Sequence, residues 1–278
     1  MLTVPVRLLG DADVAAVERL LDCEPYAGAQ IAERVAAGGL AWWRHEARLF
    51  GYGNGKRIDA LCWLGANLIP VRAGPAAVAA FADLIAGEVR GCSSIVGPAE
   101  AVVDLWDRLR PHWGPARDVR DCQPLLALDR PAAVRPDPDV RLVHAGEVDI
   151  LYPAAVAMYT EEVGVPPAGA GDTSYRERVA DLVRARRAYA RVLGGRVIFK
   201  AEVAVATRHT AQIQGVWVAP DWRGRGLATA GMAAVVADVL ERVAPTVSLY
   251  VNDFNEPARR AYARCGFRQV GTFATVLF

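Results

Sequence analysis

The sequence predicts an α+β fold, a mixed α/β architecture in which helices cover the faces of a mixed sheet. Apolar runs of strand length recur in both halves of the chain, and helical patterns lie between them. Turns rich in Gly and Pro separate the two kinds of segment. The composition, 53% hydrophobic and 23% charged, is typical of a globular protein. Interleaved strand and helix patterns of this kind favour helices packed on a sheet.

The length of the chain and one break in composition predict two domains. A chain of 278 residues exceeds the usual size of a single domain. The break is the segment 131–139, where Pro131, Pro136 and Pro138 remove backbone donors and disfavour regular structure. We therefore expect an N-terminal domain at 1–130, a linker at 131–139 and a C-terminal domain at 140–278.

The C-terminal half has the clearer pattern. It predicts strands at 140–144, 196–206, 211–218, 246–251 and 268–278. It predicts helices at 148–163, with an interruption near Pro153, and at 175–187, 227–243 and 256–264. A loop rich in Gly and Pro is expected at 164–172, and the polar turn at 207–210 predicts that the strands on either side form a hairpin.

The N-terminal half shows a fainter version of the same order. Strands are expected at 49–52 and 59–71, on either side of a turn at 53–56, and at 94–97 and 123–128. Helices are expected at 75–89 and 99–110. The similar order suggests a diverged duplication, although no long residue-level repeat accompanies it.

Charge, cysteine content and the lack of long apolar segments exclude several classes of protein. Lys and Arg total 32 against 31 for Asp and Glu, so no net field steers the chain onto nucleic acid. The five cysteines are widely spread without a CxxC pair, which argues against a metal site or a redox dithiol. Charges interrupt the N-terminal segment before a signal peptide could form, and no run reaches membrane-spanning length. We expect a cytoplasmic protein with neither a membrane nor a nucleic acid as partner.

One loop has the features of a phosphate site. A strand ending at Val218 runs through a Pro-Asp turn into Arg223-Gly224-Arg225-Gly226 and directly into an apolar helix. The first N–H groups of a helix have no intrahelical acceptor, and the helix dipole favours an anion there. Glycines at 224 and 226 allow unusual backbone angles and close approach of a ligand. With the two arginines, the loop predicts a site for a diphosphate.

Two common phosphate motifs do not fit this loop. A dinucleotide fingerprint starting at Gly224 would need a glycine at the place of Thr229. A P-loop would need a lysine at the start of the helix, and none follows Lys200. A glycine-rich turn without any ligand remains the alternative for the loop taken by itself.

A second helix downstream carries a tyrosine on its inner face. Asn255 suits the N-cap of the helix that begins at Glu256, and Gly266 suits its C-terminal end. Tyr262 shares one helical face with Ala258, Ala261 and Cys265, so it is expected to point inward. A core aromatic with a satisfied hydroxyl is the alternative to a functional role.

Together the two segments resemble the signatures of the GNAT (GCN5-related) N-acetyltransferase superfamily. Arg223 to Ala228 looks like its Q/R-x-x-G-x-G/A motif, and 216–222 looks like the V-x-V-x-P pattern that precedes it. Asn255 to Phe267 looks like its N-x-x-A-x-x-x-Y-x-x-x-G-F motif. The resemblance covers 140–278 and implies an enzyme that transfers an acetyl group from acetyl-CoA, its cosubstrate, directly to a primary amine on a small molecule or peptide.

The resemblance also implies roles for particular residues. The strand residues at 216–218 would pair with the pantetheine arm, the loop at 224–229 would hold the pyrophosphate, and Asn255 would orient the arm. Tyr262 would protonate the departing thiolate. The implied cofactor-binding residues are Val216, Trp217, Val218, Arg223, Gly224, Arg225, Gly226, Leu227, Ala228, Thr229 and Asn255.

The general base is less defined by the sequence. Some family members carry Glu five residues before the Asn, where this chain has Tyr250. Glu202 in the hairpin is the first candidate for the catalytic base, and Glu161 and Glu162 are others. A chain of water molecules or the carboxylate of Phe278 would also serve.

Two readings compete with an active transferase. The domain would act as an acyl-CoA sensor or interaction module if it binds the cosubstrate without turnover, although the presence of Tyr262 argues against this. A nucleotide-binding or DNA-associated regulator is disfavoured by the balanced charge. The N-terminal half offers only Val71-Arg-Ala-Gly-Pro75 where the glycine loop should lie, so we expect a degenerate, GNAT-like accessory domain without cofactor. This organisation resembles actinobacterial tandem GNAT proteins.

Overall fold

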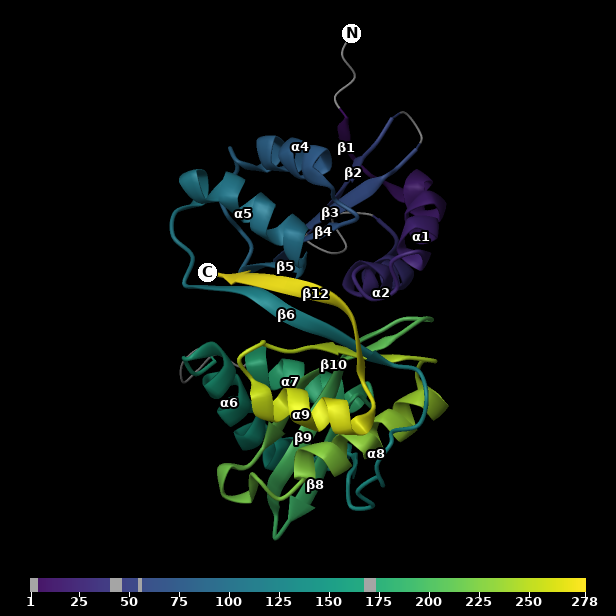
Figure 1. The fold of residues 1–278 in the computed structure, drawn as a ribbon, viewed down its shortest axis with the longest axis vertical. Coiled ribbons are helices and arrows are strands. Elements are labelled where there is room, and N and C mark those ends of the chain that lie inside the picture. Colours follow the sequence, from purple (N-terminus) through teal and green to yellow (C-terminus); the bar gives the residue numbers. More distant parts are fainter. Residues whose placement is uncertain (1–4, 41–46, 55–56, 168–173) are drawn as a thin grey trace. The chain divides into compact units, whose positions relative to one another are not determined.

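The computed structural model describes residues 5–40, 47–54, 57–167 and 174–278, and these residues form two compact units. The first unit comprises Met1–Leu125, Tyr250–Phe254 and Gln269–Phe278. The second comprises Leu126–Leu249 and Asn255–Arg268. Each unit combines strands and helices, which confirms the mixed α/β class (Figure 1).

The first repeat of elements runs from the N-terminus to the middle of the chain. Its elements are β1 (Val6–Leu8), α1 (Val14–Asp22), α2 (Ala29–Gly38), β2 (Arg48–Tyr52), β3 (Ala60–Leu64), β4 (Asn67–Val71), α4 (Pro75–Ile85), β5 (Ser94–Pro98), α5 (Ala99–Trp113) and β6 (Asp118–Leu128). Neighbouring strands are antiparallel except β4 and β5, which pair in parallel.

The second repeat has the same order of elements. They are β7 (Arg141–Leu142), α6 (Val148–Val163), α7 (Ser174–Arg184), β8 (Ala188–Leu193), β9 (Arg196–Ala206), β10 (Ala211–Val218), α8 (Leu227–Arg242), β11 (Val247–Tyr250), α9 (Glu256–Cys265) and β12 (Arg268–Leu277). Here too the pair on either side of the crossover helix, β10 and β11, is parallel, whereas β7 with β8, β8 with β9, and β9 with β10 are antiparallel. The matching order supports the diverged duplication expected from the sequence.

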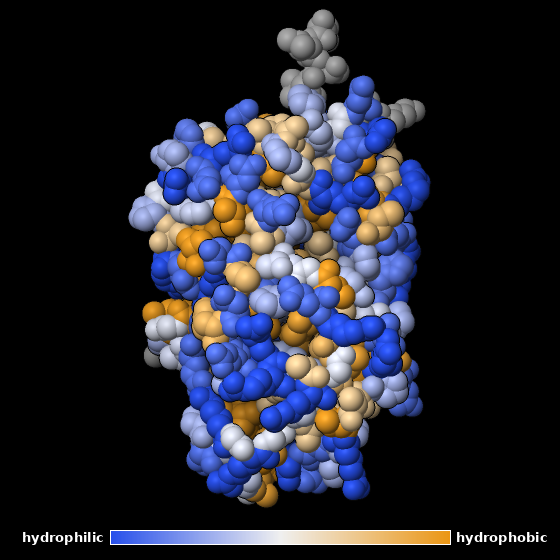
Figure 2. Space-filling model, in the orientation of Figure 1, coloured by the Kyte–Doolittle hydropathy of each residue, from blue (hydrophilic) through white to orange (hydrophobic). Residues whose placement is uncertain are grey.

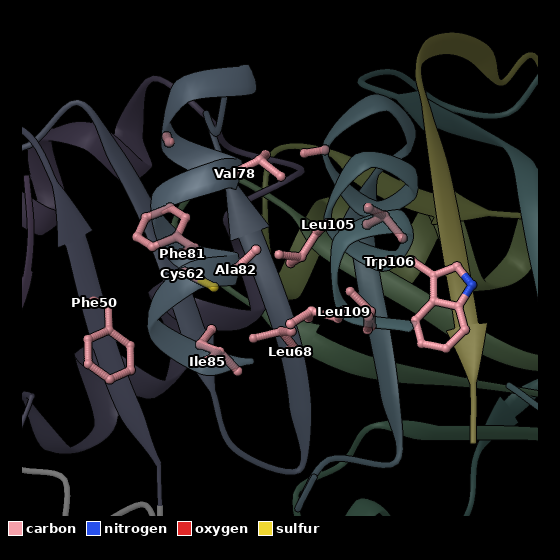
Figure 3. Close-up of a cluster of buried hydrophobic side chains, with 14 of the residues drawn as sticks. Phe50, Cys62, Leu68, Val78, Phe81, Ala82, Ile85, Leu105, Trp106 and Leu109 are labelled. Atoms are coloured by element: carbon pink, nitrogen blue, oxygen red, sulfur yellow. The ribbon is translucent and has the colours of Figure 1, made fainter. Parts of the chain in front are cut away.

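In the first unit, residues that alternate along the strands pack against different helix pairs. One core joins α4 and α5 to Phe50, Cys62 and Leu68, with Phe81 and Leu105 fully buried at its centre (Figure 3). The other joins α1 and α2 to strand residues that include Leu49, Leu61, Trp63, Ile69 and Val71. Because successive side chains of a strand point to opposite faces, the sheet lies between the two helix pairs.

In the second unit, α6 and α7 cover one face of the sheet and α8 covers the other. The α6 and α7 core includes Ala188, Ala190 and Trp217 from the strands. On the opposite face, a Cβ placed on Gly231 of α8 would lie 2.7 Å from the Phe199 ring, so α8 packs very closely on β9. Helix α9 lies beside α8, and the Cys265 thiol donates to the Thr229 carbonyl at 3.2 Å (Figure 1).

The end of the chain contributes its last strand to the first unit. Sequence analysis grouped 268–278 with the C-terminal half, whereas β12 pairs antiparallel with β5, from Phe273 opposite Pro98 to Leu277 opposite Ser94. The proline-rich segment 131–139 belongs to the second unit. There the Asp137 N–H donates to the Ala230 carbonyl at 3.0 Å, and its carboxylate accepts from Arg191 at 2.6 Å.

Most expected elements are confirmed, with a few differences. Helix α6 is continuous through Pro153, and a turn at Gly65 divides the expected run 59–71 into β3 and β4. Strands β1 and β8 and helices α1 and α2 were not anticipated. The turn expected at 53–56 and the loop at 164–172 lie partly outside the described residues.

No helix in the described part of the chain is long and apolar enough to cross a membrane. On the face drawn in Figure 2, hydrophilic side chains predominate and the hydrophobic ones are interspersed among them. The largest exposed hydrophobic fractions belong to isolated residues such as Val89 and Phe254. Scattered apolar residues of this kind are ordinary on a protein surface.

Candidate active site

The glycine loop opens onto the N-terminus of α8. Gly224 and Gly226 have φ values of +75° and +80°, which side-chain-bearing residues adopt only with strain. A Cβ at either position would meet no atom within 4 Å, so space above the loop is open. Gly226 is the N-cap of α8 and provides no side-chain cap. The start of α8 is thus the kind of helix terminus that favours an anion.

The rest of the predicted cradle lies in the first turn of the same helix. Leu227 and Ala228 begin α8, and by helix geometry their N–H groups have no intrahelical acceptor. The Thr229 N–H differs, because it donates to the Gly226 carbonyl at 3.1 Å. The backbone donors best placed for a pyrophosphate are thus those of the glycine loop and of Leu227 and Ala228.

The two arginines of the loop have partners within the second unit. Arg223 donates to the Glu161 carboxylate at 2.6 Å and to the Val218 carbonyl at 3.0 Å. The Arg225 guanidinium lies over the Trp222 ring, 4.7 Å from its centroid. Both Arg223 and Glu161 are about half exposed, and such surface ion pairs exchange readily for other partners. Because Arg223 pairs with Glu161 here, its contact with a phosphate stays a prediction.

A β-bulge lies in β10 just before the expected pantetheine-binding residues. Gln214 is opposite Glu202 and Trp217 is opposite Lys200, so β10 has one more residue than β9 between these pairs. Gly215 adopts φ +59° within the bulge. A bulge of this kind redirects backbone groups and interrupts regular pairing. Val216 lies in the bulge beside Gly215, and Trp217 and Val218 follow it directly.

The side chain of Trp217 is part of the core rather than the site surface. It packs with the core beneath α6 and α7, and its indole N–H donates to Glu161 Oε1 at 3.0 Å. Only the backbone of Trp217 is therefore placed for the contact with a cofactor arm that the sequence predicted. Glu161, expected as an alternative base, instead bridges Trp217 and Arg223.

Helix α9 positions Asn255 and Tyr262 as the sequence predicts. Asn255 is the N-cap, its side-chain oxygen accepts the Ala258 N–H at 3.3 Å, and its side chain is exposed. Gly266 ends the helix in the left-handed region with φ +101°. Tyr262 is only 6% exposed, and its ring packs edge-on against Phe267 with the centroids 5.9 Å apart.

Burial controls the ionisation of Tyr262. Loss of hydration raises the pKa of its hydroxyl well above the ordinary value, and the negative charge of Glu162 raises it further. Tyr262 therefore holds its proton throughout the physiological pH range. Glu162 lies at the end of α6 and also raises the pKa of Tyr175 on α7, so its field reaches both side chains.

Glu202 is a buried carboxylate, unlike Glu161 and Glu162, which are exposed. It lies in β9 and accepts a hydrogen bond from the Lys200 ammonium at 3.1 Å. Its charge helps to raise the pKa of Tyr175, after the larger effect of burial, so the carboxylate lies near that hydroxyl. The carboxylate thus lies inside the second unit, paired with Lys200 opposite the start of the β10 bulge.

Sequence reasoning missed Lys200 and Tyr175. Lys200 is 1% exposed, and the Tyr175 hydroxyl donates to the Ala155 carbonyl at 3.0 Å. The signal for Lys200 was present, since a Lys two residues before a Glu in an apolar strand places both on one face. Nothing in the sequence pattern distinguishes Tyr175 from an ordinary residue of an amphipathic helix.

A bulged strand, a glycine loop at a helix N-terminus and a capped helix with an inward tyrosine are features of the GNAT fold. Residues 153–267 match the model of the Acetyltransferase (GNAT) family, so the C-terminal half of this chain contains a domain of that family. Residues 47–151 match a Domain of unknown function (DUF4081), and this region fits a diverged lobe. No curated protein matches the chain.

Solved structures show the same fold over nearly the whole chain. A protein from Drosophila is 14% identical, with a TM-score of 0.68 and coverage of 99% of this chain and 98% of that one. A GCN5-related N-acetyltransferase from Sphaerobacter thermophilus is 19% identical, with a TM-score of 0.58 and coverage of 98% and 95%. A tandem GNAT protein from the clavulanic acid biosynthesis pathway is 14% identical, with a TM-score of 0.53 and coverage of 98% of both chains. At these identities the likeness shows the fold and nothing finer.

Proposed function

We propose that this protein is an N-acetyltransferase that transfers the acetyl group of acetyl-CoA directly to a primary amine. The observation that carries the proposal is the loop at Gly224 and Gly226, where two left-handed glycines leave open space at an uncapped helix N-terminus. Such a site favours a dianionic phosphate group. The backbone at 216–218, which begins within the bulge, would pair with the pantetheine arm.

The chemistry needs a proton acceptor for the amine and a proton donor for the thiolate. We assign the first role to Glu202, which is buried and held by Lys200. We assign the second to Tyr262, whose burial keeps its hydroxyl protonated. As the amine nitrogen bonds to the acyl carbon and the carbon–sulfur bond breaks, Glu202 would take the amine proton and Tyr262 would supply one to sulfur. A backbone N–H near Val218 would stabilise the charge on the acyl oxygen.

We further propose that the N-terminal lobe binds no acetyl-CoA. Strand β4 pairs with β3 in unbroken register, so it lacks the bulge found in β10. Helix α5 has the position in the first repeat that α9 has in the second. Its N-cap is Pro98 where α9 has Asn255, and Leu105, seven residues later, stands where α9 has Tyr262. The lobe thus has neither the altered backbone nor the hydroxyl that the proposed chemistry uses.

The test of the proposed function is a panel of amines incubated with acetyl-CoA and the full chain, with release of free CoA thiol as the readout. The panel should include peptides with free N-termini, lysine, amino acids, aminoglycosides and polyamines. We expect at least one amine to give turnover above the rate of acetyl-CoA hydrolysis, and mass spectrometry to find that amine heavier by one acetyl group. Tight acetyl-CoA binding with no amine acetylated would instead favour the acyl-CoA sensor.

A further inference from the structure

Lys200 is a fully buried ammonium that the two family signatures do not include. It lies in the centre of β9 and is 1% exposed. Burying an ammonium is costly unless hydrogen bonds and an opposite charge compensate for lost hydration. Lys200 Nζ has two such contacts, one to Glu202 Oε2 at 3.1 Å and one to the Gly215 carbonyl at 2.9 Å.

The second contact joins Lys200 to the bulge. The extra residue in β10 interrupts its regular pairing with β9 at Gly215, and Lys200 provides a donor for the Gly215 carbonyl. The fit is close, because a Cβ on Gly215 would lie 2.8 Å from Lys200 Nζ and 2.9 Å from Glu202 Cδ. Only glycine satisfies both the φ of +59° and this contact.

Lys200 is thus in contact with both parts of the proposed site. On one side is Glu202, the proposed proton acceptor. On the other is the carbonyl of the bulge that immediately precedes 216–218, the backbone segment proposed to receive the pantetheine arm. A buried ion pair without such a role can often be replaced by apolar residues at no cost in stability.

We infer that Lys200 is a positioning residue that fixes the Glu202 carboxylate and the β10 bulge in one geometry through a single ammonium group. The inference rests on the proposed function, because it takes Glu202 as the base and 216–218 as the cofactor strand. Other groups near the carboxylate come from α7 and α6. Tyr175 lies within the field of Glu202, and Arg178 and Glu162 act on that same tyrosine.

The experiment uses the full chain with Lys200→Met, Glu202→Gln and the double variant, and with Lys200→Arg as the conservative variant. Lys200→Met should raise the Kd for acetyl-CoA about tenfold by calorimetry, as expected for the loss of one or two hydrogen bonds that hold the strand. It should also lower kcat with the best amine by about tenfold, because the Glu202 carboxylate loses the group that fixes its orientation. Lys200→Arg should keep kcat within a few-fold of the wild-type value.

The double variant separates the two contacts of Lys200. It leaves no unpaired buried charge, so it also provides the measurement if Lys200→Met alone does not fold. Glu202→Gln should abolish the acidic limb with little change in Kd, and adding Lys200→Met should then raise the Kd by the same factor as in the wild type. Arg242→Met is the matched control, because Arg242 lies in the same unit and donates to Asp238, Tyr189 and the Arg186 carbonyl instead.

The outcomes distinguish failure of this inference from failure of the proposed function. An unchanged Kd in the double variant, together with an unchanged kcat in folded Lys200→Met, would overturn the positioning role. An acidic limb that persists in Glu202→Gln would show that another group is the base. In that case, a raised Kd in the double variant would still support Lys200 as the residue that holds the bulge.

Discussion

At the scale of single residues, the hydroxyl of Tyr262 is the atom that separates an enzyme from a binding module. The ring is buried whether or not the hydroxyl takes part in catalysis, because α9 packs that face inward. Burial and the charge of Glu162 both raise the pKa of the hydroxyl. If Tyr262 served only in packing, its protonated hydroxyl would have no role in the reaction.

Tyr262→Phe removes that oxygen and keeps the ring. We expect the Kd for acetyl-CoA to stay within a few-fold and kcat to fall by about 10²-fold, the low end of the contribution of a positioned general acid. Steady-state kinetics with the best amine of the panel, together with calorimetry, measure the two quantities. Tyr189→Phe is the matched control, since Tyr189 is also buried in this unit but donates to Asp238 instead. An unchanged kcat would mean that Tyr262 is a core residue.

Single residues were predictable where they depend on local periodicity. The spacing within 258–265 is enough to direct Tyr262 inward, and Asn255 caps its helix by a contact three residues away. The role of Lys200 was not predictable, because its partner carbonyl at Gly215 depends on an extra residue in a neighbouring strand. The pairing of Arg223 with Glu161, 62 residues apart, is likewise invisible to local patterns.

At the scale of elements, the junction of β10 and α8 is the proposed phosphate site. Gly226→Asp places a negative side chain at the N-cap, where the pyrophosphate is proposed to lie. We expect the Kd for acetyl-CoA to rise at least about tenfold, from the loss of roughly 1–2 kcal/mol of dipole and contact energy together with charge repulsion. Calorimetry on the full chain measures it.

A second glycine controls for backbone strain in this test. Gly114 has φ +75° and open space where a Cβ would lie, as Gly226 does, but it follows α5 in the first unit. Its ψ of −170° lies in a region essentially restricted to glycine, whereas Gly226 has ψ 1° in the left-handed region, so Gly114→Asp should cost at least as much stability and leave the Kd unchanged. Equal affinity of folded Gly226→Asp and Gly114→Asp would show that the phosphates bind elsewhere.

The start of α6 gives an element-scale prediction about stability and pH. Glu147 accepts the His144 N–H at 2.8 Å and two Arg141 N–H groups at 2.7 and 2.6 Å. These contacts, with Arg141 as the largest cause, lower the pKa of Glu147 to about 2. A carboxyl whose folded pKa is depressed contributes stability above its unfolded pKa, about 4.3, and loses it as pH falls through the folded value.

Glu147→Gln should therefore lower the free energy of unfolding by about 1 kcal/mol at pH 7, a modest value because Arg141 is substantially exposed. Urea unfolding at pH 7 and at pH 3 measures the difference from the wild type. The difference should be smaller at pH 3, which lies between the two pKa values. A difference that grows as the pH falls would contradict the assignment.

The bounds of helices and strands could be predicted where the hydrophobic pattern and the turn residues indicate the same ends. The bounds of β9, β10 and α6 match the expected ranges, since a polar turn or a capping segment marks their ends. Strand β8 was missed although Gly194 and Gly195 both have positive φ and close a two-residue turn to β9, a strong hairpin signal. The tight turn at 65–66 that separates β3 from β4 could not be predicted, because the apolar run at 59–71 continues through it.

At the scale of the whole chain, the two repeats do not fold from contiguous halves. Strand β12 closes the second repeat in sequence but pairs with β5 of the first unit. The Phe278 ring lies 5.5 Å from Trp106 and 6.1 Å from Trp113, centroid to centroid, with Arg90 over it at 4.2 Å. Such pairing between distant segments leaves no trace in local sequence. A fragment 140–278 would expose this strand, so binding should be measured on the full chain.

The number of acetyl-CoA molecules bound per chain tests the proposal that the second repeat binds the cosubstrate and the first does not. Among the residues that the structure describes, the second repeat alone combines two left-handed glycines before its crossover helix with the bulge and the tyrosine. In the first repeat, α4 begins after Gly74 with φ −73°, β4 is regular and Leu105 takes the place of Tyr262. Titration of the full chain should therefore show one acetyl-CoA bound, and Gly226→Asp should weaken that one site without uncovering another. Two equivalents in the wild type, or one tight site left in Gly226→Asp, would mean that the N-terminal lobe binds the cosubstrate through groups other than those of the GNAT signatures.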